Sequence, residues 1–203
     1  MRPVTTHPAR IGLVAACLLA LAAAPSPAHS QSAIKRDDVI DQLSRFESAP
    51  DIDIAALRQQ VAERAKTRSR TEPPPQKRPP IASDLLALPT FSVDIQFDTD
   101  TPIVRPESYQ TLGRIADALV HAKLLPYGFL IVGHIEANGK RESNALLSQR
   151  RADAIRDVLV NTFKISSKRL QSLGLGEEQL LDAAHPTAPV NQQIQILTIA
   201  KAQ

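Results

Sequence analysis

Alternation of apolar and polar residues in the second half of the chain predicts strands, and apolar residues three and four positions apart predict helices. FSVDIQF (91–97) and QIQILTI (193–199) alternate as half-covered strands do. FLIVGH (129–134) is a continuous apolar run, which is typical of a central strand covered on both faces. LQSLGLGEE (170–178) indicates a further strand at an edge, so four strands are expected.

Two helices are predicted between these strands. The first begins near Pro106 and has one apolar face, formed by Leu112, Ile115, Ala116 and Leu119. The second runs from about 142 to 163. The order strand, helix, strand, helix, strand, strand predicts an α/β (α+β) two-layer sandwich over residues 85–203. In this βαβαββ domain, the helices are expected on one face of a four-stranded sheet.

The first thirty residues have the layout of a secretory signal peptide. Arg2 and Arg10 precede the apolar run IGLVAACLLALAAA, small residues follow, and cleavage is expected after Ser30. A lipoprotein signal modified at Cys17 is the alternative, although the apolar run continues past that cysteine. No second apolar run is long enough to cross a membrane as a helix.

The composition of the chain after residue 30 makes some classes of function less favoured. The remainder has 22 basic and 21 acidic side chains, so its charge does not favour binding to nucleic acid. Cys17 is the one cysteine of the sequence, so no disulfide or thiolate metal site is expected in the remainder.

Two segments precede the predicted domain. Residues 31–70 carry two short apolar stripes at helical spacing, one with Val39, Ile40, Leu43 and Phe46 and one with Ile54, Leu57 and Val61. A pair of adapter helices and a partly disordered arm both fit this pattern. Residues 71–84 are basic and proline-rich, which predicts a stiff, extended linker. The linker is either a solvated spacer or a contact for anionic polymers of the cell envelope.

One charged residue falls on the apolar face of the second predicted helix. At roughly 100° per residue, Arg151 projects about 40° from Ile155, inside the stripe that Leu147 and Val158 share. Asn144 and Ser148 project to nearly the same angle. One interpretation is that Arg151 buries its stem and extends its charged end to water, beside residues that cap the helix start. The other is that these side chains form a site in which the buried Arg151 cation pairs with the carboxylate of a ligand.

Five segments together resemble the OmpA-like periplasmic domain, a family that binds peptidoglycan. They are FSVDIQFDTDT, GHIEANG, SNALLSQRRADAI, KRLQSLGLGEE and NQQIQI, and the resemblance covers about residues 88–200. It implies a pocket for the diaminopimelate of the peptidoglycan stem peptide, with a carboxylate in the turn and an arginine on the following helix. Carried over to this sequence, the ligand-binding residues are Glu136, Asn144, Leu147, Arg151 and Asn191, and Gly139 forms the turn.

This sequence departs from the family pattern at two places. The Thr-Asp of the family is Ile135-Glu136 here, which keeps the charge, lengthens the side chain and removes a hydroxyl. The late Asn-Arg-Arg of the family is Asn191 followed by Gln192 and Gln193, so two positive charges are missing. We therefore expect a pocket that is less positive than that of the family.

Catalysis is not expected. Asp98 and Asp100 lie in a turn before a helix, where short acids cap and turn the backbone. His134, Glu136 and His185 could be read as metal ligands, but the sequence does not supply a convincing third ligand beside His134 and Glu136. No nucleophile elbow or phosphate loop is present in the sequence. We therefore expect no enzyme activity, no cofactor and no metal.

The predicted function is that of a non-catalytic periplasmic protein, associated with the outer membrane or cell wall, that binds peptidoglycan. The alternative is an OmpA-like scaffold for protein–protein interaction that does not bind peptidoglycan. In either case an envelope protein is a candidate partner for the N-terminal arm.

Overall fold

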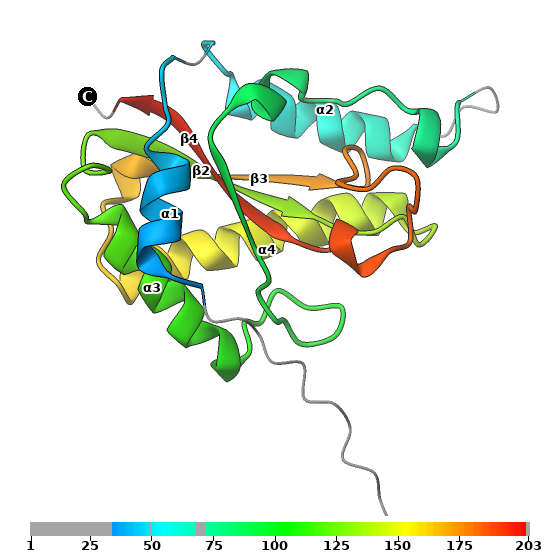
Figure 1. Ribbon diagram of the computed structural model, residues 1–203. Helices are drawn as coiled ribbons and strands as arrows, with labels where there is room; N and C mark the ends of the chain where they lie inside the picture. The colour runs from blue at the N-terminus through cyan, green and yellow to red at the C-terminus, as the bar shows by residue number, and fades with distance from the viewer. Residues whose placement is uncertain (1–33, 49, 68–71, 202–203) are drawn as a thin grey trace, which may run out of the picture. The chain divides into compact units, whose positions relative to one another are not determined.

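A computed structural model describes residues 34–48, 50–67 and 72–201 (Figure 1). From β1 onward, the helices and strands follow the predicted order strand, helix, strand, helix, strand, strand. The elements are α1 (Arg36–Leu43), α2 (Ile54–Lys66), β1 (Thr90–Val93), α3 (Tyr109–Leu119), β2 (Tyr127–His134), α4 (Arg141–Asn161), β3 (Leu170–Gly176) and β4 (Ile194–Lys201). Among the described residues, no helix has both the length and the apolar composition needed to cross a lipid bilayer.

The four strands form one mixed sheet in the order β1-β4-β2-β3. β4 is antiparallel to both of its neighbours, whereas β2 and β3 run parallel because α4 crosses over between them. β2 is central, and its residues 128–134 are all buried, as the apolar run predicted. The predicted α+β class and four-stranded sheet are confirmed.

β1 is shorter than the alternating pattern of residues 91–97 predicted. Its ladder ends where Val93 pairs with Ile194, which is the first residue of β4. Beyond that point β1 has no partner strand, and Phe97 pairs only with Val104 in an isolated bridge. The chain from 94 to 102 is therefore a loop beside the end of the sheet.

One face of the sheet is covered by α1, α3 and α4. Phe129 and Ile131 of β2 point into this layer and are fully buried. They pack with Ile155 and Leu159 of α4 and with Leu112 of α3. This is the hydrophobic core that the helical and strand periodicities predicted.

The other face is also covered, which corrects the expectation that helices lie on one face. Leu130 and Val132, the alternate residues of β2, pack with Val61 of α2 and Leu85 of the following segment. In Figure 1, α2 runs along the sheet near β3. Its Arg58 Nε donates to Gln149 Oε1 of α4 at 3.2 Å, so the two helices meet beside this edge strand. The physical reason is that β2 is apolar on both faces, so a two-layer arrangement would leave Leu130 and Val132 in water.

α1 and α2 do not form an arm separate from the sheet, although the sequence had allowed one. Val39 and Leu43 of α1 are fully buried in the first core, and the buried hydroxyl of Thr198 donates to the Leu43 carbonyl at 2.8 Å. Both helices belong to the same compact unit as the sheet. Each apolar stripe is too short to fold alone, and the sheet supplies the surface that buries it. That residues 85–203 fold without these helices stays a prediction.

α4 lies directly on the sheet at Ser148 and Gln149, where β2 and β3 have glycines. A Cβ at Gly174 would lie 2.5 Å from the Gln149 Cα, and a Cβ at Gly133 would meet the Ser148 carbonyl. The Ser148 hydroxyl donates to the Ala145 carbonyl at 2.9 Å and accepts from the Gly176 amide at 2.9 Å. Ser148 therefore lies on the apolar face because close helix–sheet packing requires a small side chain there.

Gly174→Ala is expected to destabilise the protein by about 1–3 kcal/mol, because the added methyl group overlaps the α4 backbone. Gly113→Ala in α3 is the matched control, since its Cβ would make an ordinary 3.4 Å contact with the Phe163 ring. There the change should be neutral or stabilising by up to about 1 kcal/mol. Urea unfolding measures both, and equal midpoints for the two variants would contradict this packing.

Candidate functional site

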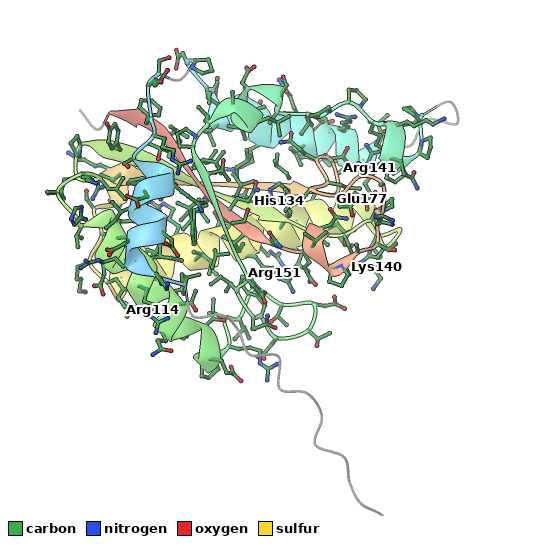
Figure 2. All side chains as sticks on the ribbon, in the orientation of Figure 1. Arg114, His134, Lys140, Arg141, Arg151 and Glu177 are labelled. Atoms are coloured by element: carbon green, nitrogen blue, oxygen red, sulfur yellow. The ribbon has the colours of Figure 1, made fainter. Side chains whose placement is uncertain are left out.

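The predicted site lies where β2 ends and α4 begins, beside the loop that follows β1. Figure 2 shows Lys140, Arg141 and Glu177 at one end of the molecule, away from Arg114. The turn between the two elements contains Gly139 with φ +84°, a left-handed conformation that glycine adopts without strain. The structure thus agrees with the turn-forming role of Gly139.

Arg151 is buried, with 5% of its surface exposed, and extends toward the loop after β1. Its Nε donates to the Thr101 carbonyl at 3.0 Å, and its guanidinium carbon lies 4.6 Å from the centroid of the Phe97 ring. Burial lowers the pKa of Arg151, and the charges of Asp100 and Glu136 oppose that effect. Within the described residues, no hydrogen bond to its two terminal nitrogens is found and no carboxylate forms an ion pair with it.

Glu136 carries a buried carboxylate oxygen for which the described residues supply no hydrogen-bond donor. Its Oε2 is buried and makes no hydrogen bond within the described part of the chain. Glu136 lies close enough to Arg151 for their charges to interact, but the two side chains do not pair directly. A buried carboxylate oxygen without a donor is unfavourable, so these two groups are suited to a ligand that has both an ammonium and a carboxylate group.

Asn144 holds the turn in place. Its Nδ2 lies within hydrogen-bond distance of the Glu136 carbonyl at 3.2 Å, Asn138 Oδ1 at 2.9 Å and Glu177 Oε2 at 3.0 Å. Because these acceptors occupy its donors, Asn144 positions the turn and Glu136 rather than donating to a ligand.

Two hollows flank this arrangement. The first, of about 350 Å³, is bordered by Asp100, Asn138, Lys140, Asn144 and Leu147, so the predicted residues Asn144 and Leu147 do share a cavity. The second, of about 90 Å³, lies on the other side and is bordered by Arg151 with His134, Gln192 and Gln193. The glutamines that replace the arginines of the family pattern therefore lie beside Arg151, and no cation of the described residues takes their place in that hollow.

Asn191 anchors a loop, and its predicted contact with a ligand stays a prediction. It is fully buried, its Oδ1 accepts from the Asp182 amide at 2.8 Å, and its Nδ2 donates to the His185 carbonyl at 2.9 Å and the Asp182 carbonyl at 3.1 Å. With both ends of the amide engaged, Asn191 closes the loop before β4. A resemblance in sequence does not distinguish such a loop anchor from a ligand contact.

His134 is buried between two glutamines. Its Nδ1 lies 3.0 Å from the Gln179 carbonyl and its Nε2 lies 3.0 Å from the Gln195 side-chain amide. Burial lowers the pKa of His134, which favours the neutral ring. A neutral ring carries one N–H, so it donates to one of these two oxygens, the Gln179 carbonyl or Gln195 Oε1, at the end of β2.

A buried ionic network behind the turn was not found from the sequence. Arg141, the first residue of α4, donates through Nε and Nη2 to both carboxylate oxygens of Glu178, the second contact being 2.7 Å. Its Nη1 donates to Glu72 at 2.6 Å, and Arg64 of α2 lies 3.2 Å from Glu178. The same carboxylates raise the pKa of Arg141.

The network also includes the segment that was predicted to be a linker. Arg78 donates to Glu177 at 3.1 Å, and both side chains are largely buried. The basic proline-rich segment thus packs against acidic residues of its own chain. The adjacent pair Glu177-Glu178, at the end of an edge strand, was the signal available in the sequence.

Comparison with known proteins finds a family match over part of this chain. Residues 96–194 match the model of the OmpA family. The chain is 32% identical over 114 residues to outer membrane porin F of Pseudomonas aeruginosa, which covers 55% of this chain and 32% of that protein. It is 40% identical over 85 residues to the peptidoglycan-associated lipoprotein of Rhizobium meliloti, which covers 42% of this chain and 47% of that protein.

Both curated relatives are matched over less than half of their own length. Among solved structures, the cell wall anchor of the T6SS from Pseudomonas aeruginosa is 28% identical, with a TM-score of 0.43, over 55% of this chain and 80% of that one.

Proposed function

Residues 96–194 of this chain are an OmpA family domain, and from this we propose that the protein is a non-catalytic component of the cell envelope that binds peptidoglycan. The names of two similar proteins, a peptidoglycan-associated lipoprotein and a cell wall anchor, attribute such contacts to those proteins. The ligand we propose is the diaminopimelate residue of the stem peptide.

The observation that carries this proposal is the arrangement of Arg151 and Glu136. The free end of diaminopimelate is an amino-acid centre with one carboxylate and one ammonium group. Arg151 would take the carboxylate through its two terminal nitrogens. Glu136 Oε2, which is buried without a partner among the described residues, would take the ammonium. Each charge-assisted hydrogen bond of this kind contributes about 1.5–3 kcal/mol.

Affinity should be modest because of the departures at Ile135, Gln192 and Gln193. Ile135 is 2% exposed, so the hydroxyl of the family's threonine is replaced by a core side chain. Lys140 borders the hollow of about 350 Å³ and offers a cation there, whereas the two glutamines border the hollow of about 90 Å³.

We place the protein in the periplasm, at the outer membrane or cell wall. This location rests on the secretory signal predicted at residues 1–30. These residues, and with them Cys17 of the alternative lipoprotein signal, lie outside the described residues. A bulk charge near neutrality after residue 30 gives no support for a nucleic acid partner.

A protein-interaction scaffold is the second candidate, and one surface favours it. An apolar groove of about 280 Å³ runs between α2 and α4, bordered by Val61, Ala65, Ala145 and Leu146. Leu146 is 52% exposed although it lies beside this groove. Exposed apolar surface in a groove is a common feature of protein contacts, so an envelope protein that binds at α2 fits this candidate.

Cosedimentation with insoluble peptidoglycan sacculi tests the proposal. The purified protein is expected to sediment with sacculi whose stem peptides contain diaminopimelate. It should sediment much less with sacculi that have lysine at that position, because lysine lacks the second carboxylate. Equal binding to both would overturn the diaminopimelate assignment, and binding to neither would favour the protein-interaction scaffold.

A further inference from the structure

Glu177 connects the candidate binding turn with the proline-rich segment that precedes β1. Its Oε2 accepts from Asn144 at 3.0 Å, and its Oε1 accepts from Arg78 at 3.1 Å. Glu177 itself is 5% exposed. The buried Glu177 carboxylate thus connects Asn144, which positions the turn, with Arg78, which lies 99 positions before Glu177 in the sequence.

A second contact from the same segment reaches the base of the turn. Glu72 accepts from Arg141 at 2.6 Å, and Arg141 begins α4 directly after the turn. Arg78 also lies 3.7 Å from Glu72, so the two charged ends of the segment interact with each other. A cavity of about 440 Å³ separates Pro73–Pro75 from Ala137 and Gly139, which leaves room for the turn to move.

Removing this segment would leave charges buried behind the turn. Glu177 would keep the Asn144 contact and lose its cation, and Arg141 would lose one of its two carboxylates. An uncompensated buried carboxylate is strongly unfavourable, so Glu177 would move toward water or another cation. Because Asn144 contacts both Glu177 and the Glu136 carbonyl, such a movement would displace Glu136.

We propose that the docking of residues 72–78 on Glu177 and Arg141 holds the turn in its ligand-binding geometry, so that peptidoglycan binding and docking of this segment strengthen each other. Glu177 is a positioning residue, and Arg78 is its counter-ion. The inference rests on the proposed function for the identity of the ligand. Thermodynamic linkage makes the coupling reciprocal: an event that detaches the segment weakens binding, and ligand binding holds the segment in place.

Arg78→Gln tests the coupling, with Lys77→Gln as its matched control. Both changes remove one positive charge from the same segment. Lys77 is exposed, however, and its side chain makes no hydrogen bond or ion pair with the described residues; its backbone amide bonds to the Pro74 carbonyl, which the substitution keeps. Arg78→Gln is expected to weaken cosedimentation with diaminopimelate sacculi about tenfold, while Lys77→Gln leaves it unchanged. Arg78→Lys should restore part of the affinity, because it returns the charge without the guanidinium geometry.

A second measurement does not depend on the ligand. Hydrogen exchange of the backbone amides of Asn138 and Asn144, which bond to the Glu136 and Lys140 carbonyls, reports opening of the turn. Exchange should be faster in Arg78→Gln than in Lys77→Gln. Equal exchange in both would overturn the coupling, whereas failure of the wild type to bind sacculi would overturn the proposed function alone.

Discussion

Arg151→Ala is expected to abolish cosedimentation with diaminopimelate sacculi while the protein still unfolds cooperatively. Within the described part of the chain, the guanidinium makes one hydrogen bond, to the Thr101 carbonyl, and no ion pair with a carboxylate, so few internal contacts are lost. The proposed ligand carboxylate, in contrast, loses its cation. Arg151→Lys should rescue binding only in part, because an ammonium does not reproduce the bidentate geometry.

Arg45→Ala is the matched control, because Arg45 is exposed and distant in sequence from the turn. It should leave both binding and thermal unfolding unchanged. If Arg151 were purely structural, its removal would lower the melting temperature strongly and leave sacculus binding as it was. That result would contradict the pocket proposed around Arg151 and Glu136.

Arg141→Met is expected to produce the largest loss of stability, about 3–5 kcal/mol by urea unfolding. Arg141 and Glu178 are 3% and 2% exposed. Removing the cation leaves Glu178 with one ion pair among the described residues, the 3.2 Å contact to Arg64. The double variant Arg141→Met with Glu178→Leu should recover much of the loss, because it leaves no unpaired buried charge at this position. Equal stability of Arg141→Met and the wild type would contradict a stabilising role of the buried Arg141–Glu178 pair.

The same variant should change the dependence of stability on pH. The hydrogen bond from Arg141 lowers the pKa of Glu72 below its usual 4.5. The stability that this carboxylate contributes is therefore present above pH 4.5 and is lost as the pH falls through the lowered pKa. Without Arg141 this lowering of the Glu72 pKa becomes smaller, because only the charges of Arg78 and Arg64 remain to favour the carboxylate. The variant should therefore lose less stability across that acidic range than the wild type does.

The spacing of apolar residues was sufficient to predict β2, α3 and α4. Within one helix or strand, that spacing reflects which side chains face the core. Helical phase also placed Arg151 on the inward side of α4, where it is buried. Helical phase did not predict that Arg151 contacts Phe97 and Thr101. Both residues lie in the loop after β1, and this loop forms because the pairing of β1 stops at the first residue of β4. Asn191 matched a family motif, but its hydrogen bonds anchor a loop.

The sequence by itself determined the four strands, the inward position of Arg151 and the resemblance that points to peptidoglycan, because all three are carried by neighbouring residues. Only the tertiary structure decided that α2 covers the second face of the sheet and that Arg141, Glu178 and Glu72 form one buried network. Partners 37 and 69 residues apart leave no periodic signal. Their pairing follows from burial, because a charge removed from water must find an opposite charge wherever the fold brings one near.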